Sequence, residues 1–271
     1  MSIIERSLQK RAANARSEQQ AAIPARTRAA QPATNAPPPG RTYRSVQLNP
    51  EVLEANRILA GINDPLATSA YKMLRTRILQ RVASNSWRNL GVTGTVSGEG
   101  KSLTAINLAL ALARDVSTNV FLVDMDLQRP SIATQLGLSF DKGLSDYLAG
   151  NATLEEIIYS PGIERLAVIP NAHRNSHHSE LLSSPKMDEL MQSLAQETPP
   201  RIVIYDLPPL LVSDDVLSIA PRIDGLLLVV SQGMTQRKVL ESARDVLSEM
   251  NLIGVVLNRS TENEKRDYGY Y

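Results

Sequence analysis

Six segments of the chain read as strands, several of them as continuous apolar runs, and helical patterns lie between them. Strands that are covered on both faces of a parallel sheet read as such runs, whereas half-exposed strands alternate apolar and polar positions. This alternation of strands and helices predicts an α/β fold with a doubly wound, mainly parallel sheet and helices on both faces. The expected strands are 89–95, 119–124, 165–170, 201–206, 225–230 and 252–258, and the expected helices between them are 101–114, 143–158, 185–196, 214–220 and 235–250.

A further helix is expected just ahead of the first strand. Pro65 suits a first helical turn, and apolar residues then recur at three- and four-residue steps through Tyr71, Leu74, Ile78 and Val82. The spacing predicts a helix that precedes the sheet.

The first fifty residues differ from the rest of the chain in composition. They carry eight Lys and Arg, two Glu and six prolines, so their net charge is +6 in a chain whose total is +1. Such a segment buries too little apolar surface to offset the entropy that ordering costs. The sequence therefore predicts a disordered basic arm over 1–50, a folded domain over 51–262 and a flexible tail over 263–271.

One short stretch of the arm leaves two interpretations open. Ile3, Ile4 and Leu8 fall near one face of a short helix whose other face carries Arg6 and Lys10. Such a helix can lie on an acidic membrane surface or a partner, and the same pattern also fits a frayed, solvated helix.

Three absences in the sequence narrow the class of protein. The chain has no cysteine, it has no run of eighteen apolar residues, and its first ten residues lack the apolar core of a secretory signal. We therefore expect a cytoplasmic protein without disulfides, thiolate metal sites or a transmembrane span.

The most informative segment is 94–102, GTVSGEGKS, which lies between an expected strand and an expected helix. Gly98 and Gly100 let backbone N–H groups converge on phosphate oxygens, and the start of the following helix points its positive dipole at the same place. In such a loop Lys101 would reach the β- and γ-phosphates of a nucleotide, and the Ser102 hydroxyl would bind Mg²⁺. The segment therefore predicts a phosphate-binding loop.

Carboxylates that could complete a metal site follow two of the expected strands. Asp124 and Asp126 end one strand two positions apart, so both project to the same side. Asp206 ends another strand, ahead of two prolines that cannot continue a central strand. Nucleotides bind at the carboxyl edge of open parallel sheets. We therefore expect the three acids beside the phosphate-binding loop.

Together these motifs resemble the bacterial tyrosine kinases (BY-kinases) of capsule and exopolysaccharide biosynthesis, which are P-loop relatives of MinD and ParA. The resemblance covers about 65–271 and includes the phosphate-binding loop, the two acid-tipped strands and the helix segment 70–77. It also includes the chain end, where Tyr268, Tyr270 and Tyr271 are three of the eight tyrosines. A tail of phenols is a suitable acceptor because it can enter a neighbour's cleft without unfolding any structure.

This resemblance implies an ATP-dependent protein-tyrosine autokinase that phosphorylates its C-terminal tyrosines in trans, with ATP and Mg²⁺ as cofactors. Asp124 would then be the carboxylate nearest the incoming phenol. The catalytic residues would be Lys101, Asp124 and Asp126; the nucleotide would lie at Gly98, Glu99, Gly100, Lys101, Ser102, Leu103, Asn258 and Arg259; the metal ligands would be Ser102, Asp124, Asp126 and Asp206; and the phosphoacceptors would be Tyr268, Tyr270 and Tyr271.

The resemblance also implies partners. These are a membrane polysaccharide co-polymerase, or chain-length activator, that acts in trans, a second copy of the chain, and a cognate tyrosine phosphatase. The activator would hold the protein at the inner face of the membrane. Nucleic-acid binding has little support, because the chain beyond the arm is acidic overall and lacks a stripe of basic and aromatic residues.

Two departures from the family pattern bear on activity and assembly. The family shows D-x-D-x-R where this chain has Gln128, with the cation moved to Arg129. The family's oligomerising helix reads E-x-x-R-x-x-R, whereas this chain has Ser69 and Lys72 at the first two of these positions. Lysine cannot reproduce a bidentate arginine contact, so ring assembly stays open.

Two alternative functions therefore remain. A switch ATPase of the partition or cell-division type would share the fold, but its signature lysine falls at the place of Val96. A nucleotide-dependent regulator of a polysaccharide-export membrane partner would share the site without tyrosine transfer.

The histidines at 173, 177 and 178 lie in a polar stretch that favours a solvated loop over a metal site.

Overall fold

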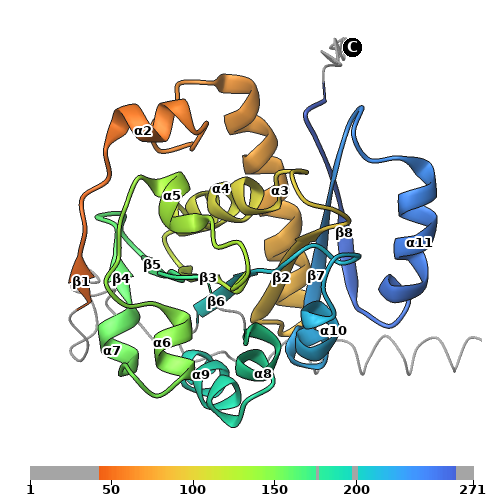
Figure 1. The fold of residues 1–271 in the computed structure, drawn as a ribbon. Helices are drawn as coiled ribbons and strands as arrows, with labels where there is room; N and C mark the ends of the chain where they lie inside the picture. Colours follow the sequence, from red (N-terminus) through yellow and green to blue (C-terminus); the bar gives the residue numbers. More distant parts are fainter. Residues whose placement is uncertain (1–42, 175–176, 197–200, 261–271) are drawn as a thin grey trace, which may run out of the picture. The chain divides into compact units, whose positions relative to one another are not determined.

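A computed structural model describes residues 43–174, 177–196 and 201–260. These residues form an eight-stranded sheet in the order β1-β4-β5-β3-β6-β2-β7-β8, with helices on both faces (Figure 1). Every neighbouring pair is parallel except β4 and β5. The doubly wound, mainly parallel α/β fold is therefore confirmed. The phenols of the tail and residues 1–42 of the arm lie outside the described residues.

The six expected strands are all present, within one residue at each end. Two strands of two residues each, β1 and β4, were not expected. The strands are β1 (Arg44–Ser45), β2 (Asn89–Gly94), β3 (Asn119–Asp124), β4 (Tyr159–Ser160), β5 (Leu166–Ile169), β6 (Arg201–Asp206), β7 (Gly225–Ser231) and β8 (Leu252–Asn258).

The helices follow the expected pattern less closely. Short helices α2, α5 and α8 were not expected, and no helix of the described residues is long and apolar enough to cross a membrane. The helices are α2 (Pro50–Ala55), α3 (Pro65–Asn85), α4 (Lys101–Ala113), α5 (Ile132–Leu136), α6 (Leu144–Leu148), α7 (Leu154–Ile157), α8 (His178–Leu182), α9 (Pro185–Ala195), α10 (Asp215–Ile219), the 3-10 turn η1 (Ala220–Arg222) and α11 (Arg237–Leu247).

The prediction of one helix over 143–158 is wrong, because the chain turns between α6 and α7. Gly150 has a φ of +81°, a left-handed conformation that ends α6. Thr153 then caps a new helix, α7, and its backbone N–H donates to the Glu156 side chain in a capping box. Local backbone chemistry therefore overrides the continuous apolar pattern at this place.

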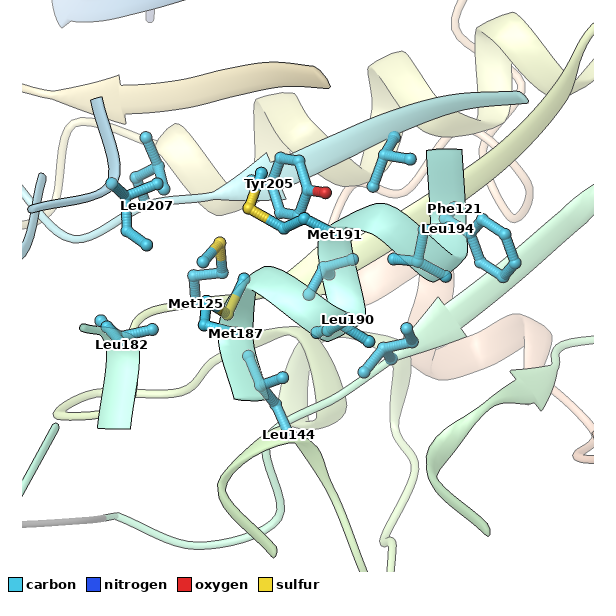
Figure 2. Close-up of a cluster of buried hydrophobic side chains, with 14 of the residues drawn as sticks. Phe121, Met125, Leu144, Leu182, Met187, Leu190, Met191, Leu194, Tyr205 and Leu207 are labelled. Carbon is cyan, nitrogen blue, oxygen red and sulfur yellow. The ribbon is translucent and has the colours of Figure 1, made fainter. Parts of the chain in front are cut away.

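The core lies in two layers, one on each face of the sheet. Along β3, Phe121 and Val123 face the layer formed with α6, α8 and α9, and Val120 and Leu122 face the layer formed with α3 and α4. Figure 2 shows the first layer, where Met187, Leu190 and Leu194 of α9 pack beside Tyr205 and Phe121. Burial on both faces explains why the strands read as continuous apolar runs.

The sheet includes residues that the sequence had assigned to the basic arm. Arg44 pairs with Tyr159 in a short parallel ladder. The neighbouring Tyr43 ring lies edge-on to Phe121, and the Arg201 guanidinium lies 4.6 Å from the Phe121 ring centre. Through Tyr43, the hydrophobic core thus includes part of the segment before residue 50.

Candidate active site

The phosphate-binding loop joins β2 to α4. Gly98 and Gly100 have φ values of +88° and +92°, which a residue with a Cβ adopts only with strain. The loop ends where α4 begins, and the amides of Lys101, Ser102 and Leu103 belong to its first turn. First-turn amides have no partner within a helix and favour an anion. The expected cradle of glycines and helix start is present.

Strand ends bring the expected acids to this loop. β3 and β6 are parallel neighbours with Asp124 opposite Asp206 in register. The Lys101 Nζ lies 3.0 Å from Oδ2 of Asp126 and 3.5 Å from Oδ1 of Asp206. It also donates to the Ser102 hydroxyl at 3.2 Å. Residues that are far apart in the sequence therefore form one buried cluster.

Asp124 is fully buried, as Asp206 is. Its Oδ2 accepts hydrogen bonds from the backbone N–H groups of Ser131 and Ile132, both at 3.0 Å. Burial, together with the charge of Asp206, raises the pKa of Asp124 to about 8. Without a bound cation, this carboxyl is therefore mostly protonated at neutral pH.

The other charges in the cluster respond to the same burial. Burial raises the pKa of Asp206 above the usual range of aspartate, although Lys101 acts in the opposite direction. Burial alone would lower the pKa of Lys101, but the carboxylates of Asp206, Asp126 and Asp124 outweigh it and raise that pKa. Lys101 is therefore held as a buried cation by its acidic neighbours.

The oxygen atoms at the loop fit a magnesium ion that is completed by phosphate and water. The Oδ2 atom of Asp206 is buried and has no hydrogen-bond partner among the described residues. Ser102 and Asp206 offer the hard oxygen ligands that Mg²⁺ prefers. In the part of the chain that the structure describes, no three His, Cys, Asp or Glu side chains could hold a metal by themselves. The ion would therefore depend on the nucleotide, as Mg²⁺ commonly does.

The side chain of Glu99 anchors the phosphate-binding loop and does not point to the phosphate site that its sequence position suggests. Its side chain is fully buried and accepts hydrogen bonds from the Thr95 N–H at 2.5 Å, the Thr95 hydroxyl at 2.6 Å and the Val96 N–H at 3.1 Å. The Thr235 hydroxyl, from the loop after β7, donates to the same carboxylate. Only the backbone of Glu99 remains for a phosphate. Threonine replaces the consensus glycine at 95, and its hydroxyl is part of this anchor.

Asn258 and Arg259 reach the loop from the end of β8. The Asn258 amide donates to the Glu99 carbonyl at 2.9 Å, and the Arg259 guanidinium donates to the Gly98 carbonyl at 2.9 Å. A Cβ on Gly100 would lie 2.0 Å from Nδ2 of Asn258. Both residues thus border the phosphate cradle, and the resemblance named both among the residues at the nucleotide.

The segment after Asp126 contacts the loop and a helix pair. Arg129 donates to the Ser97 hydroxyl at 3.3 Å, so the displaced cation does reach the phosphate-binding loop. Gln128 turns to His178, which lies 2.8 Å from Asp215. The expectation of a solvated loop at His178 is wrong, because this residue begins α8. Asp215 contacts it across 37 residues of chain, and no local pattern could have indicated that.

Comparison with known proteins assigns the chain to a protein family. Residues 90–268 match the family model of the CobQ/CobB/MinD/ParA nucleotide-binding domain, so the chain belongs to this nucleotide-binding family. Its resemblance to the bacterial tyrosine kinases is also confirmed. The tyrosine-protein kinase YwqD of Bacillus subtilis (strain 168) is 30% identical over 208 residues, which cover 76% of this chain and 86% of YwqD.

Two further relatives agree with this placement. The kinase domain of the Escherichia coli tyrosine kinase ETK has a TM-score of 0.68 at 26% identity, covering 85% of this chain and 93% of that domain. The succinoglycan biosynthesis transport protein ExoP of Rhizobium meliloti (strain 1021) is 30% identical over 197 residues. Those residues cover 70% of this chain but only 24% of ExoP, which is therefore a much larger protein.

Proposed function

We propose that this chain is an ATP-dependent protein-tyrosine autokinase that regulates exopolysaccharide or capsule synthesis and export. The observation that carries the proposal is the meeting of Lys101 with Asp126 and Asp206 at the start of α4. The names of YwqD, a tyrosine kinase, and ExoP, a succinoglycan biosynthesis protein, support the kinase activity and the process.

In this proposal the triphosphate of ATP lies on the backbone amides from Gly98 to Leu103. Lys101 exchanges its partner Asp126 for the β- and γ-phosphate oxygens. Ser102 and Asp206 would hold Mg²⁺, and Asp124 and Asp126 would complete its surroundings directly or through water. The ion supplies positive charge that neutralises the phosphates. Asn258 and Arg259, at the end of β8, would hold the base.

The transfer forms a bond between the acceptor phenol oxygen and the γ-phosphorus, while the bond from that phosphorus to the β–γ bridging oxygen breaks and ADP leaves. The phenol proton passes to Asp124. Asp124 can take this proton only as a carboxylate, and the nearby positive charge of Lys101 and of a bound Mg²⁺ would keep it ionised. Lys101 stabilises the charge on the transferring group.

The proposed acceptors are Tyr268, Tyr270 and Tyr271 of a second copy of the chain. They lie outside the described residues, so their support is the sequence itself: exposed phenols grouped at a chain end. Self-association is part of the proposal, because transfer in trans needs two copies to meet.

The proposed activator is a membrane polysaccharide co-polymerase on a separate polypeptide, which would hold the kinase at the inner face of the membrane. The support for a membrane partner is the similarity to ExoP, a protein named for succinoglycan biosynthesis transport. A cognate tyrosine phosphatase would reverse the modification. Coexpression with the membrane proteins of polysaccharide systems should raise the phosphorylation of the tail, and no rise with any of them contradicts this partner.

The activity is tested with purified protein, ATP and Mg²⁺, followed by phosphotyrosine detection and mass spectrometry of the C-terminal peptide. We expect signal that disappears in Lys101→Met and in the triple substitution of Tyr268, Tyr270 and Tyr271 by Phe. Signal that survives the triple substitution would show that the acceptors lie elsewhere.

A second function is a nucleotide-dependent regulator of a polysaccharide-export partner that transfers no phosphate to tyrosine. Gln128, in place of the family's arginine, favours it. Binding of ATP without any phosphotyrosine, alone and with the activator, would select this function over the kinase.

A further inference from the structure

Three polar side chains from separate elements meet beside the proposed metal site. Asp215 is the first residue of α10, His178 is the first residue of α8, and Gln128 lies in the loop after β3. The His178 Nδ1 is 2.8 Å from Oδ2 of Asp215, and its Nε2 is 2.8 Å from the Gln128 side-chain amide. The imidazole is thus held at both of its nitrogen atoms.

The burial of the group favours a fixed orientation of the ring. The Asp215 side chain is 1% exposed and the His178 side chain 19%. The Ser179 hydroxyl also donates to Oδ1 of Asp215 at 2.7 Å. When the Gln128 amide donates to Nε2, the ring proton lies on Nδ1 and is donated to Asp215. The Gln128 amide, the ring N–H and the Ser179 hydroxyl then each donate to an acceptor.

Gln128 belongs to the short loop that positions Asp126. The Oδ2 atom of Asp126 faces Lys101 at 3.0 Å, and its Oδ1 accepts the Arg129 N–H at 2.9 Å. Arg129 in turn reaches the Ser97 hydroxyl of the phosphate-binding loop. The loop therefore has anchors on both sides of Gln128, and His178 is the partner of the residue between them.

We propose that His178, oriented by Asp215, is a positioning residue that holds Gln128 and thereby keeps Asp126 directed at the metal and Lys101. The inference rests on the proposed magnesium-nucleotide site and deepens it. The position that carries arginine in the D-x-D-x-R pattern here has an amide that His178 contacts. The chain of contacts runs from Asp215 of α10 through His178 of α8 to Gln128, in the loop that carries Asp126.

A purely structural role would tie α8 to α10 and leave the metal site unaffected. The two roles differ in what Gln128 does. If it transmits the position of His178, removal of either side chain has the same consequence at Asp126. If it is a passive neighbour, the two removals act independently.

The test measures ADP affinity by isothermal titration calorimetry, with and without Mg²⁺, in the full chain and in His178→Ala, Gln128→Ala and the double variant. The gain is the ratio of ADP affinity with Mg²⁺ to ADP affinity without it. We expect this ratio to be about 10-fold smaller in each single variant, as is typical when an outer partner of a metal ligand is removed. The double variant should lose no more than one single variant. Affinity for ADP without Mg²⁺ should stay within about twofold, because the phosphate cradle itself is unchanged.

Two controls separate this effect from misfolding. His173→Ala removes an exposed histidine of the same segment and should leave the Mg²⁺ gain unchanged. Gln128→Ala keeps the pair of His178 and Asp215, so its thermal melting should match the parent chain. Losses that multiply in the double variant, or equal losses without Mg²⁺, overturn the inference.

The readout does not depend on phosphate transfer. A parent chain that binds Mg²⁺-ADP but never produces phosphotyrosine contradicts the kinase activity. The inference about His178 is then still decided by the ADP titrations of its variants. A parent chain that gains no ADP affinity from Mg²⁺ overturns the inference.

Discussion

The Nζ atom of Lys101 lies 3.0 Å from Oδ2 of Asp126, inside a cluster that is almost closed to solvent. A buried ammonium without a partner would cost several kcal/mol. The carboxylate supplies that partner in the nucleotide-free protein. In the function we propose, phosphate oxygens would replace it when a nucleotide binds, so that the lysine stays paired in both states.

Lys101→Met should weaken both nucleotide binding and the fold. We expect ADP affinity to fall at least about 10-fold, because the phosphates lose their point charge. The free energy of unfolding at pH 8 should fall by about 3–5 kcal/mol, because the substitution leaves buried carboxylates without their cation. Calorimetry and urea denaturation measure the two effects. Lys238→Met, at an exposed lysine of α11, is the matched control and should change neither.

The stability of the metal-free protein should depend on the ionisation of Asp124. Its pKa is raised to about 8 in the folded state, so folding favours the protonated form. The resulting stability is complete below about pH 4, the usual pKa of aspartate, and is lost as the pH rises toward 8. Relative to Asp124→Asn, the wild type should lose about 1.4 kcal/mol per pH unit between roughly pH 5 and 7.

Urea denaturation at several pH values measures this slope. Saturating Mg²⁺-ADP should remove it, because a nearby cation favours the ionised carboxylate. A wild-type curve that runs parallel to that of Asp124→Asn without metal would contradict the raised pKa.

The central strands were predictable because nearly all residues of β2, β3, β6 and β7 are buried, on both faces of the sheet. Phe121 and Val123 must be apolar for one layer, and Val120 and Leu122 for the other. β1 and β4 carry no such signal, because two residues are too few to show a period. Their pairing depends on contacts between distant parts of the chain.

The acids of the site could be predicted because parallel strands deliver their ends to one edge of the sheet. The side-chain direction of Glu99 could not, since its anchor includes Thr235, which is 136 positions away. His178 was missed for the same reason. Sequence patterns thus indicate which residues reach the site, whereas three-dimensional packing decides where each side chain points.

The two glycines of the phosphate-binding loop should differ in their tolerance of alanine. Both have left-handed backbones, so each substitution should cost about 1–2 kcal/mol of stability from strain. A Cβ at Gly98 would meet only Met234, at 3.7 Å, whereas one at Gly100 would displace Asn258 from the Glu99 carbonyl. We therefore expect Gly100→Ala to lose about 10-fold more ADP affinity than Gly98→Ala.

Gly150→Ala provides the control for strain alone. This glycine has a φ of +81° with nothing within 4 Å of an added Cβ, in the turn after α6. Its substitution should lower the melting temperature as Gly98→Ala does and leave ADP affinity unchanged. Equal affinities for the two loop variants would show that the Asn258 contact is not needed for binding.

The buried carboxylate of Glu99 joins the phosphate-binding loop to the loop after β7 through the Thr235 hydroxyl. Thr235→Val keeps the shape of this side chain but removes a donor to a buried charge. Hydrogen bonds to charged groups contribute about 1.5–3 kcal/mol, so the free energy of unfolding should fall by that amount. ADP affinity should fall with it, because Glu99 also fixes the start of the loop through Thr95 and Val96. Thr235→Ser retains the hydroxyl and should restore most of both quantities. If Val and Ser behave alike in denaturation and calorimetry, the two loops are held together by packing and not by this hydrogen bond.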